Sequence, residues 1–583
     1  MKTLYRLALG LLLLPAVHAA DPLSIAEIHG DGVEPRFVDE QVTTEGIVTL
    51  VLPRQFWIQT PSESPSSTRD GLEVFTGDPA AVNVGDRVRV TGFVNRFRRP
   101  DREKDLMVTR LIQPEIEVLA RGQALPAAIP LGQAGWQVPD NLADENPSVD
   151  PTASAIDFWT HYSGMRMVVG EHRVIQATNR FGDTWVLPAT EHPRLNELGV
   201  LAASPDDLDL ERILITANPR LQPEDAPPAL PGSHFTRIDG VANYAFGQFR
   251  VTTRHALEPV EVAIEIRDTR LHRGPEHLTV ASYNVENLDP LIESIERVNG
   301  ERDIDDDIGS GRMARLGEHI AILLAGPDIV ALQEIQDNNG AEQGDVLSAD
   351  RTLTALIEAV RAAGGPDYAF IDLPPPAPDA FGGQPGGNIR NAFLYNPARV
   401  ELLPPGPRQI DDPAFAGSRA PLLAGFEFNG HRLMLINNHF SSKWGSSPQF
   451  GEQPQIIGGE AERPAQADAL RRLLDAENAW GGEAHWIVLG DLNDHWFSEA
   501  LSHLKAEDSV QPLINLIETL PEADRWTYLF SGNAQAIDHL LVTPELAERA
   551  EFEILHPNAR FPDQAADHEP LLGRFHLPPA AER

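Results

Sequence analysis

The chain has 583 residues and is strongly acidic, with 86 Asp and Glu against 47 Lys and Arg, a formal net charge of −39. One hydrophobic core does not extend over such a length, so we expect about two to four domains. The apolar fraction of 42% and the charged fraction of 23% are ordinary for a soluble globular protein. The negative field repels nucleic acid, phospholipid headgroups and other polyanions unless a local patch or bound cations reverse it. Solubility in salty surroundings is the simpler explanation of the acid excess.

The N-terminal residues MKTLYRLALGLLLLPAVHAAD are typical of a secretory signal peptide. Lys2 and Arg6 form a basic start, an apolar stretch follows over Leu7–Leu14, and small residues predict cleavage at Ala19, with Ala20 as the alternative. No later segment approaches roughly eighteen apolar residues, so we expect a secreted protein, periplasmic or extracellular, without membrane insertion. The chain has no cysteine. This excludes a lipid-anchored lipoprotein and leaves folding to core burial, with bound metal as a further contribution.

Residues 23–120 are predicted to form a small all-β domain. Five apolar or alternating runs between residues 41 and 112 are separated by Gly, Pro, Ser and Asp clusters, a pattern typical of five successive strands. Such a series fits a Greek-key barrel of the OB-fold type. The Pro- and Ala-rich residues 121–155 are predicted to be a linker. Residues 156–270 repeat the strand order more weakly and predict a second β-rich, OB-like module.

Residues 276–577 are predicted to form an α/β domain, because strands and helices alternate there over roughly 300 residues. Residues 311–326, GRMARLGEHIAILLAG, are predicted to form an amphipathic helix with Met313, Leu316, Ile320 and Leu323 on one face. Polar side chains collect where the predicted strands begin or end: Asn284, Glu334, His439, Asp491, Asn493, Asp538, His539, Asp567 and His568. Singly, each has an ordinary explanation as a turn, cap or hydrogen-bonded core residue. As an ordered set at strand termini they predict an active site.

The motifs YNVEN, DIVALQEI, INNHFSSK, LGDLND, AIDHLLV and ADHEP, taken in this order, resemble the endonuclease/exonuclease/phosphatase superfamily. The resemblance covers residues 277–577 and is greatest to bacterial secreted nucleases. It implies an α/β fold, a four-layered sandwich of two packed sheets flanked by helices. It also implies a metal-dependent phosphodiester hydrolase.

The resemblance further implies residue roles. Glu334 would be the principal ligand of Mg²⁺ or Mn²⁺, with Ca²⁺ as an alternative, and Asn284 and Asp567 would assist it. Asp491 and Asn493 would align and activate the attacking water and hold a phosphate oxygen or a second metal.

Histidines and arginines complete the implied site. Asp538 would orient His568 as an acid/base unit, and His439 would donate to the phosphate or the leaving oxygen. Arg419 would contact substrate phosphate. Arg390 would do the same or form a salt bridge at a strand end.

The sequence departs from the family pattern near NIRNAFLY, where no acid is found to orient His439. The polar, Gly-rich insert after His439, residues 441–455, is predicted to be a mobile loop over the site. His495 and His539 are additional histidines, which we interpret as structural or substrate-lining.

The leading functional hypothesis is a secreted nuclease acting on DNA, with RNA as a further substrate, and working as a monomer. The alternative is a secreted phosphodiesterase or phosphatase acting on lipid headgroups or small phosphate esters. A catalytically inactive binding protein is disfavoured, because the set of site residues is complete. The N-terminal modules are expected either to hold nucleic acid or to act as spacers. The basic run RFRRPDREK, residues 96–104, is predicted to be a hairpin loop that binds DNA or a solvated loop.

Overall fold

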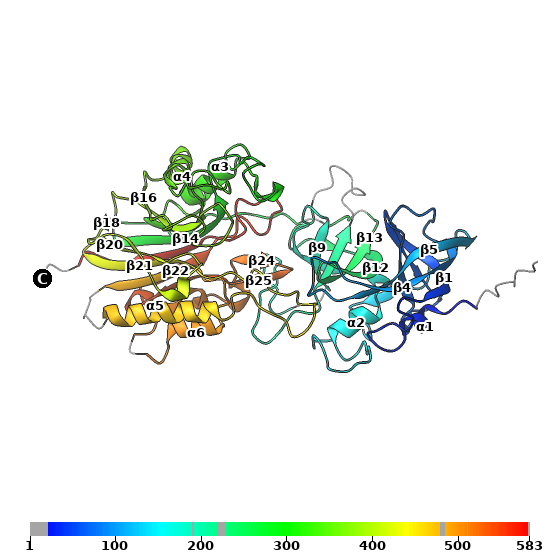
Figure 1. Ribbon diagram of the computed structural model, residues 1–583. Coiled ribbons are helices and arrows are strands. Elements are labelled where there is room, and N and C mark those ends of the chain that lie inside the picture. Colours follow the sequence, from blue (N-terminus) through cyan, green and yellow to red (C-terminus); the bar gives the residue numbers. More distant parts are fainter. Residues whose placement is uncertain are drawn as a thin grey trace, which may run out of the picture.

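The computed structural model describes residues 21–188, 192–217, 228–255, 257–260, 262–478, 484–509 and 511–580. The predicted signal peptide lies outside this range. Figure 1 shows the two N-terminal β modules at one end of the molecule and the C-terminal α/β domain at the other. No helix in the described part of the chain has the length and apolar character needed to cross a membrane.

The first module is a closed barrel of five strands in the order β1-β2-β3-β5-β4. These are β1 (Gln41–Leu52), β2 (Gln55–Gln59), β3 (Gly71–Phe75), β4 (Arg87–Phe97) and β5 (Val108–Ala120). Burial alternates along β4, which places Val88, Val90 and Val94 in the barrel core. Helix α1 (Ile25–His29) packs its isoleucines against that core. The arrangement is consistent with the predicted OB-like barrel.

The second module is one eight-stranded sheet in the order β11-β8-β9-β10-β13-β12-β7-β6, with β11 and β6 at its edges, rather than a repeat of the barrel. Its strands are β6 (Ile129–Leu131), β7 (Arg166–Val169), β8 (His172–Gln176), β9 (Asp183–Pro188), β10 (Ile213–Ala217), β11 (His234–Phe235), β12 (Ile238–Ala245) and β13 (Gln248–Thr253). Helix α2 (Ala155–His161) packs Phe158 and Trp159 into its core.

The stretch 121–155, expected to be a linker, is part of this second module. Strand β6 pairs in parallel with β7, and Trp136 and Val138 pack against the module's core. The apolar residues between the prolines of this stretch pack against the module, and β6 forms an edge strand of its sheet. A linker would make no such contacts.

The C-terminal domain contains two sheets. The six-stranded sheet has the order β16-β17-β15-β14-β28-β27, and the second has the path β18-β20-β21-β22-β26-β23 with β19 beside β20. The first contains β14 (His277–Leu288), β15 (Ile329–Ile335), β16 (Ala369–Asp372), β17 (Arg390–Tyr395), β27 (Ala550–Ile554) and β28 (Leu571–His576). The second contains β18 (Glu401–Leu402), β19 (Arg408–Gln409), β20 (Leu422–Phe428), β21 (His431–His439), β22 (His485–Asp491), β23 (Ile514–Asn515) and β26 (Asp538–Val542).

The two sheets pack face to face, and helices cover their outer faces (Figure 1). One core joins the inner faces, with Val280 and Ile329 from the first sheet and Leu435 from the second. The helices are α3 (Arg312–Glu318), continued by a π-helical turn over His319–Leu323, α4 (Asp350–Ala362), α5 (Glu462–Asn478), α6 (Glu499–Lys505) and α7 (Pro544–Ala547). Residues of α3 and α4 pack on the six-stranded sheet and residues of α5 and α6 on the other. This four-layered α/β sandwich confirms the predicted fold class.

The N-terminal modules contact two loops of the C-terminal domain. In the first, residues 440–461, Phe450 packs into the core of the second module and its carbonyl accepts a hydrogen bond from the Tyr244 hydroxyl at 2.8 Å. Arg98 of the barrel forms an ion pair with Glu452 of the same loop.

The second loop carries the hairpin of β24 (Tyr528–Phe530) and β25 (Asn533–Gln535). Val200 of the second module packs with Trp526 and Leu529, and Ala534 N donates to Leu201 O at 2.8 Å. Both loops border the strand ends described next, so the fold brings the N-terminal modules to the rim of the candidate site.

Candidate active site

Three neighbouring strands of the seven-stranded sheet present reactive side chains at one level. His439, the last residue of β21, pairs in register with Asp491 of β22, and Asp491 pairs with Asp538, the first residue of β26. Gly490 makes this close approach possible, because its φ is 123° and a Cβ there would lie 2.1 Å from Asn438 O. Strand register alone therefore brings an imidazole and two carboxylates together.

The six-stranded sheet supplies the opposite wall. Asn284 of β14 donates from Nδ2 to Glu334 Oε1 at 3.0 Å and to Asp491 Oδ2 at 3.1 Å, so one amide connects the two sheets. Glu334 lies at a register shift between β14 and β15 with φ 61°, an uncommon conformation for a residue other than glycine. Asn287 N donates to Glu334 Oε2 at 3.1 Å. Strained backbone held by its surroundings is typical of functional sites.

His568 and Asp538 form a buried pair. His568 Nδ1 lies 2.7 Å from Asp538 Oδ2, and its Nε2 lies 3.8 Å from Asp491 Oδ2 and 3.8 Å from Asp567 Oδ1. Burial alone would lower the pKa of His568, but the charges of Asp538, Asp567 and Asp491 outweigh burial and raise that pKa well above its ordinary value. The imidazole is therefore held in its charged form.

His439 has the opposite environment. Its Nε2 lies 3.4 Å from Asp491 Oδ2 and 3.7 Å from Glu334 Oε1. Its buried Nδ1 has no hydrogen-bond partner among the described residues, as expected from the missing acid near NIRNAFLY. Burial, followed by the charges of Arg419 and His568, lowers the pKa of His439 well below its ordinary value. This imidazole is held neutral.

Asp491 and Asn493 form a compact turn after β22. Asn493 N donates to Asp491 Oδ1 at 2.8 Å, and its Nδ2 donates to Asp491 Oδ2 at 3.2 Å. Burial raises the pKa of Asp491 to about 7; the charge of His568 opposes this, and those of Asp538 and Glu334 add to it. A carboxylate whose pKa is near neutrality is suited to accept a proton.

The donor set fits a hard divalent cation. Burial raises the pKa of Asp567, with a further contribution from the charge of Glu334, and burial followed by the charge of Asp567 raises the pKa of Glu286 to about 8. Crowded carboxylates of this kind are stabilised by a bound cation, and oxygen ligands suit Mg²⁺ or Mn²⁺. Glu286 was missed by the sequence analysis, although it lies within the quoted YNVEN motif.

The two arginines predicted to contact phosphate differ in position. Arg419 is buried close enough to Glu334 and Asp491 for their charges to affect its pKa, and its Nε has no partner among the described residues. Arg390 donates to the carbonyls of Asn388 and Leu347 and pairs with Asp372 at 3.4 Å. Those contacts favour the salt-bridge alternative for Arg390, because its guanidinium is committed to them.

The two additional histidines have structural partners. His539 lies between Asn515 Nδ2, 3.0 Å from its Nδ1, and Asp494 O, 2.9 Å from its Nε2. His495 stacks on Phe497 with ring centroids 4.9 Å apart. Three further side chains were not singled out from the sequence: Tyr528, whose ring lies 4.9 Å from that of His568, Lys443, and Trp444, the residue after Lys443.

The loop after His439 carries the last two of these. Lys443 Nζ lies 3.9 Å from Asp494 Oδ1, and burial, partly opposed by the charge of Asp494, lowers the pKa of Lys443 to about 8. Trp444 is 90% exposed. Phe450, farther along the same loop, is packed into the second module. The loop is therefore held at this point, whereas its composition predicted a mobile insert.

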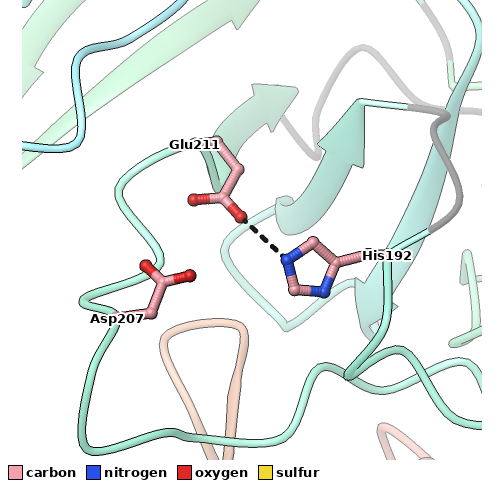
Figure 2. A group of neighbouring side chains, drawn as sticks. All are labelled: His192, Asp207 and Glu211. Carbon is pink, nitrogen blue, oxygen red and sulfur yellow. Dashed lines mark ion pairs between the residues drawn. The ribbon is translucent and has the colours of Figure 1, made fainter.

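A separate group of three side chains, His192, Asp207 and Glu211, lies in the second module (Figure 2). The group borders a cavity of about 1030 Å³. Its polar atoms already have partners in the protein: His192 Nδ1 accepts from Arg194 N at 3.3 Å, and Asp207 pairs with Arg194 at 2.6 Å. His192 Nε2 lies 3.6 Å from Glu211 Oε1. This group is thus bound within its own module and takes no part in the strand-end site.

Comparison with known proteins gives two family matches. Residues 281–568 match the profile described as the Endonuclease/Exonuclease/phosphatase family, and residues 118–263 match a family described as a domain of unknown function. No curated protein matches the chain in sequence.

Three solved structures illustrate the similarity found among known folds. They are the human Nocturnin catalytic domain with bound sulfate (16% identity, 54% of this chain and 97% of that chain, TM-score 0.36), an endonuclease/exonuclease/phosphatase from Bacteroides vulgatus (17%, 52% and 99%, 0.34) and D. rerio TDP2 complexed with single strand DNA product (18%, 51% and 98%, 0.33).

Proposed function

Residues 281–568 belong to the endonuclease/exonuclease/phosphatase family, a family of phosphodiester hydrolases, and from this premise we propose that the protein is a secreted, divalent-metal-dependent nuclease that cleaves DNA. The observation that carries the proposal is the meeting of His439, Asp491, Asp538 and His568 with Glu334 at one edge of two packed sheets. The site thus combines a charged histidine, a neutral histidine and a set of metal-binding carboxylates.

The residues that would hold the ion are Glu334, Asn284 and Asp567. A bound Mg²⁺ or Mn²⁺ supplies charge stabilisation at phosphorus and polarises a phosphate oxygen. Asn284 already lies at hydrogen-bond distance from Glu334 and Asp491, so it orients both carboxylates. Asp567 lies beside His568 and adds negative charge on the same side.

The protein's own side chains divide the proton transfers. Asp491, aligned by Asn493, accepts the proton of the attacking water, since its pKa is raised to about 7 by burial. His568, kept charged and oriented by Asp538, donates a proton to the leaving oxygen. His439 contributes a neutral N–H to a phosphate oxygen, and Arg419 adds a fixed positive charge.

The surroundings of the site favour nucleic acid over a small phosphate ester. Trp444 is 90% exposed on the loop that leaves His439, where an indole face is available for a nucleobase. Lys443 beside it supplies positive charge in an otherwise acidic protein. No feature in the described residues specifically favours lipid headgroups. The alternative, a phosphodiesterase or phosphatase, is therefore tested only by including a small phosphodiester among the substrates.

The test is hydrolysis of plasmid, linear single-stranded DNA, RNA and a generic small phosphodiester, with and without Mg²⁺. We expect DNA cleavage that stops in excess chelator and returns with Mg²⁺ or Mn²⁺. The Glu334→Gln variant should remain folded but bind the activating metal much more weakly. Full hydrolysis in excess chelator would exclude this mechanism, and turnover of only the small phosphodiester would favour the alternative substrate class.

A further inference from the structure

A second group of carboxylates lies in the loop between β14 and α3, next to the candidate active site. Asp289 and Glu293 come from the start of this loop and Asp305 from its later part, and each offers an oxygen that lies within 4.8 Å of the others. Asp289 and Glu293 are buried, whereas Asp305 is exposed. The exposed member leaves a route from solvent to the buried pair.

One oxygen of Asp289 has no hydrogen-bond partner within the described part of the chain. Asp289 is 0% exposed; its Oδ1 accepts a hydrogen bond from Leu291 N at 2.8 Å, while its buried Oδ2 accepts none from the described residues. Glu293, in contrast, accepts from Ala341 N at 3.2 Å and from Asp305 N at 3.1 Å. An unpaired, fully buried carboxylate oxygen is costly, so its presence calls for a ligand.

The nearby basic side chains are engaged elsewhere. Arg312 pairs with Asp307, and Arg297 pairs with Glu342 at 2.6 Å. Within the described ranges, no Lys, Arg or His forms an ion pair with Asp289, Glu293 or Asp305. Burial, followed by the charge of Glu293, raises the pKa of Asp289 to about 9, which reflects uncompensated negative charge.

A backbone turn at Gly340 lies close to the unpaired oxygen. Gly340 has φ 59°, and a Cβ at that position would lie 2.3 Å from Glu293 Oε1 and 2.7 Å from Asp289 Oδ2. Both acceptor oxygens therefore face the same turn, which approaches them closely only because residue 340 is glycine.

We propose that Asp289, Glu293 and Asp305 form a binding site for Ca²⁺ that is separate from the catalytic metal. The ligands are all oxygens, as hard cations require. Calcium is favoured over magnesium because Mg²⁺ usually retains several waters, whereas two of the three carboxylates here are buried among protein atoms.

The site is connected to the catalytic residues through Arg312. This arginine pairs with Asp307 and also donates to the backbone carbonyls of Val285, Glu286 and Ala565. Asp307 in turn accepts from Asp289 N at 3.0 Å. A cation at the carboxylates would therefore stabilise the backbone on both sides of the candidate active site, as a positioning element.

The experiment measures thermal unfolding and calcium binding in the full-length protein, with the catalytic metal site disabled by Glu334→Gln. We expect Ca²⁺ at 100 times its Kd to add about 2.7 kcal/mol of stability and calorimetry to give one bound ion per chain. Asp289→Asn in the same background should abolish binding and the rise in Tm. It should also be at least as stable as its parent in chelator, because a repelling buried charge is removed.

Two controls keep the outcomes distinct. Asp305→Asn changes an exposed ligand with little risk to folding and should weaken Ca²⁺ binding tenfold or more, whereas Asp345→Asn, at an exposed acid outside the group, should bind as its parent does. An equal rise in Tm with Ca²⁺ in the parent and in Asp289→Asn would overturn the proposal. The proposal would also be overturned if the parent bound no Ca²⁺ and Asp289→Asn were more stable than the parent under all conditions. In that case a proton, and not a cation, neutralises the Asp289 carboxyl group. Since all readouts are binding and stability, these results do not depend on nuclease activity.

Discussion

At the residue scale, the two histidines of the candidate site are held in opposite charge states by their neighbours. His568 faces Asp538, Asp567 and Asp491, and its pKa is raised, whereas His439 is buried near Arg419 and its pKa is lowered. Environments that push two pKa values apart allow one group to donate a proton while the other stays neutral. The division of roles therefore depends on the partners of each imidazole, Asp538 above all.

Asp538 and His568 should act as one unit. Both His568→Ala and His439→Ala should lower kcat by ~10²–10⁴-fold, the usual contribution of an acid/base group. Asp538→Asn should act mainly through His568, so the Asp538→Asn/His568→Ala double variant should be little slower than His568→Ala alone. The measurement is kcat for the wild type and the four variants on one DNA substrate; fully multiplicative losses for Asp538→Asn and His568→Ala would show that these two residues work independently.

His539 should contribute to acid sensitivity of the fold. Burial lowers its pKa from 6.5 to about 4, so between these pH values the unfolded chain binds more protons than the folded protein. Stability supplied by neutral His539 is complete above about pH 6.5 and is lost as pH falls toward 4, a loss of roughly 2 kcal/mol by pH 5. His539→Gln should show a smaller fall in Tm between pH 7.5 and pH 5. His503→Gln, at a partly exposed position on α6, is the matched control; an unchanged pH dependence in His539→Gln would refute the assignment.

At the element scale, the catalytic half was predictable because its chemistry lies at strand ends. Apolar runs followed by polar motifs located the termini of β15, β21 and β22; strand register then fixed the side chains of β21 and β22 side by side, and packing of the two sheets brought Glu334 of β15 opposite them. For Arg390 the sequence left two roles open, a phosphate contact and a salt bridge at a strand end. Only tertiary contacts reveal that Arg390 is held by Asn388, Leu347 and Asp372.

The loop over residues 440–461 carries the clearest candidate for contact with a nucleobase. Replacing Trp444 by Ala should raise KM for single-stranded DNA by roughly 5- to 150-fold, since base stacking on an aromatic ring contributes ~1–3 kcal/mol. Turnover of a small phosphodiester should be unchanged, because it has no base to stack. Trp444→Phe should retain most of the affinity. Equal KM values for Trp444→Ala and wild type on DNA would show that the indole takes no part in binding.

At the scale of the whole molecule, the N-terminal modules contact both loops that border the site. Residues distant in sequence, such as Tyr244 and Phe450, meet there, and no local pattern predicts such a pair. The basic run of the barrel illustrates the same point. Arg98 pairs with Glu452 of the C-terminal domain, which no local pattern predicts, whereas Arg99 pairs with Asp101 of the same run and residues 99–104 are exposed, as in a solvated loop. Binding of DNA by this run stays a prediction.

Phe450 should therefore control the order of the loop after His439. Phe450→Ala removes a buried ring, at a typical cost of ~3–5 kcal/mol, and should loosen the loop without unfolding the sheets. We expect faster tryptic cleavage at Lys443 and a lower kcat even on a small phosphodiester. Phe530→Ala, at a ring that is 56% exposed on β24, is the control. If both variants cleave and react like wild type, the contact has no influence on the site.

The apolar contacts at Phe450 and Trp526 also affect whether an N-terminal module could be replaced by another domain without exposing apolar surface. Both rings belong to the catalytic half of the chain; Phe450 packs on Phe249 of the second module, and Trp526, which stacks on His556 of its own domain, also packs with Val200 of the second module. A catalytic fragment expressed alone would present two hydrophobic anchors to water and tend to self-associate. The first barrel meets the same loop through polar contacts such as Arg98 with Glu452. Gene fusions that replace the barrel would need to cover Val241 of the second module, on which Leu50 and Trp57 of the barrel pack, whereas those that replace the second module would need to rebuild the contacts of Phe450 and Trp526.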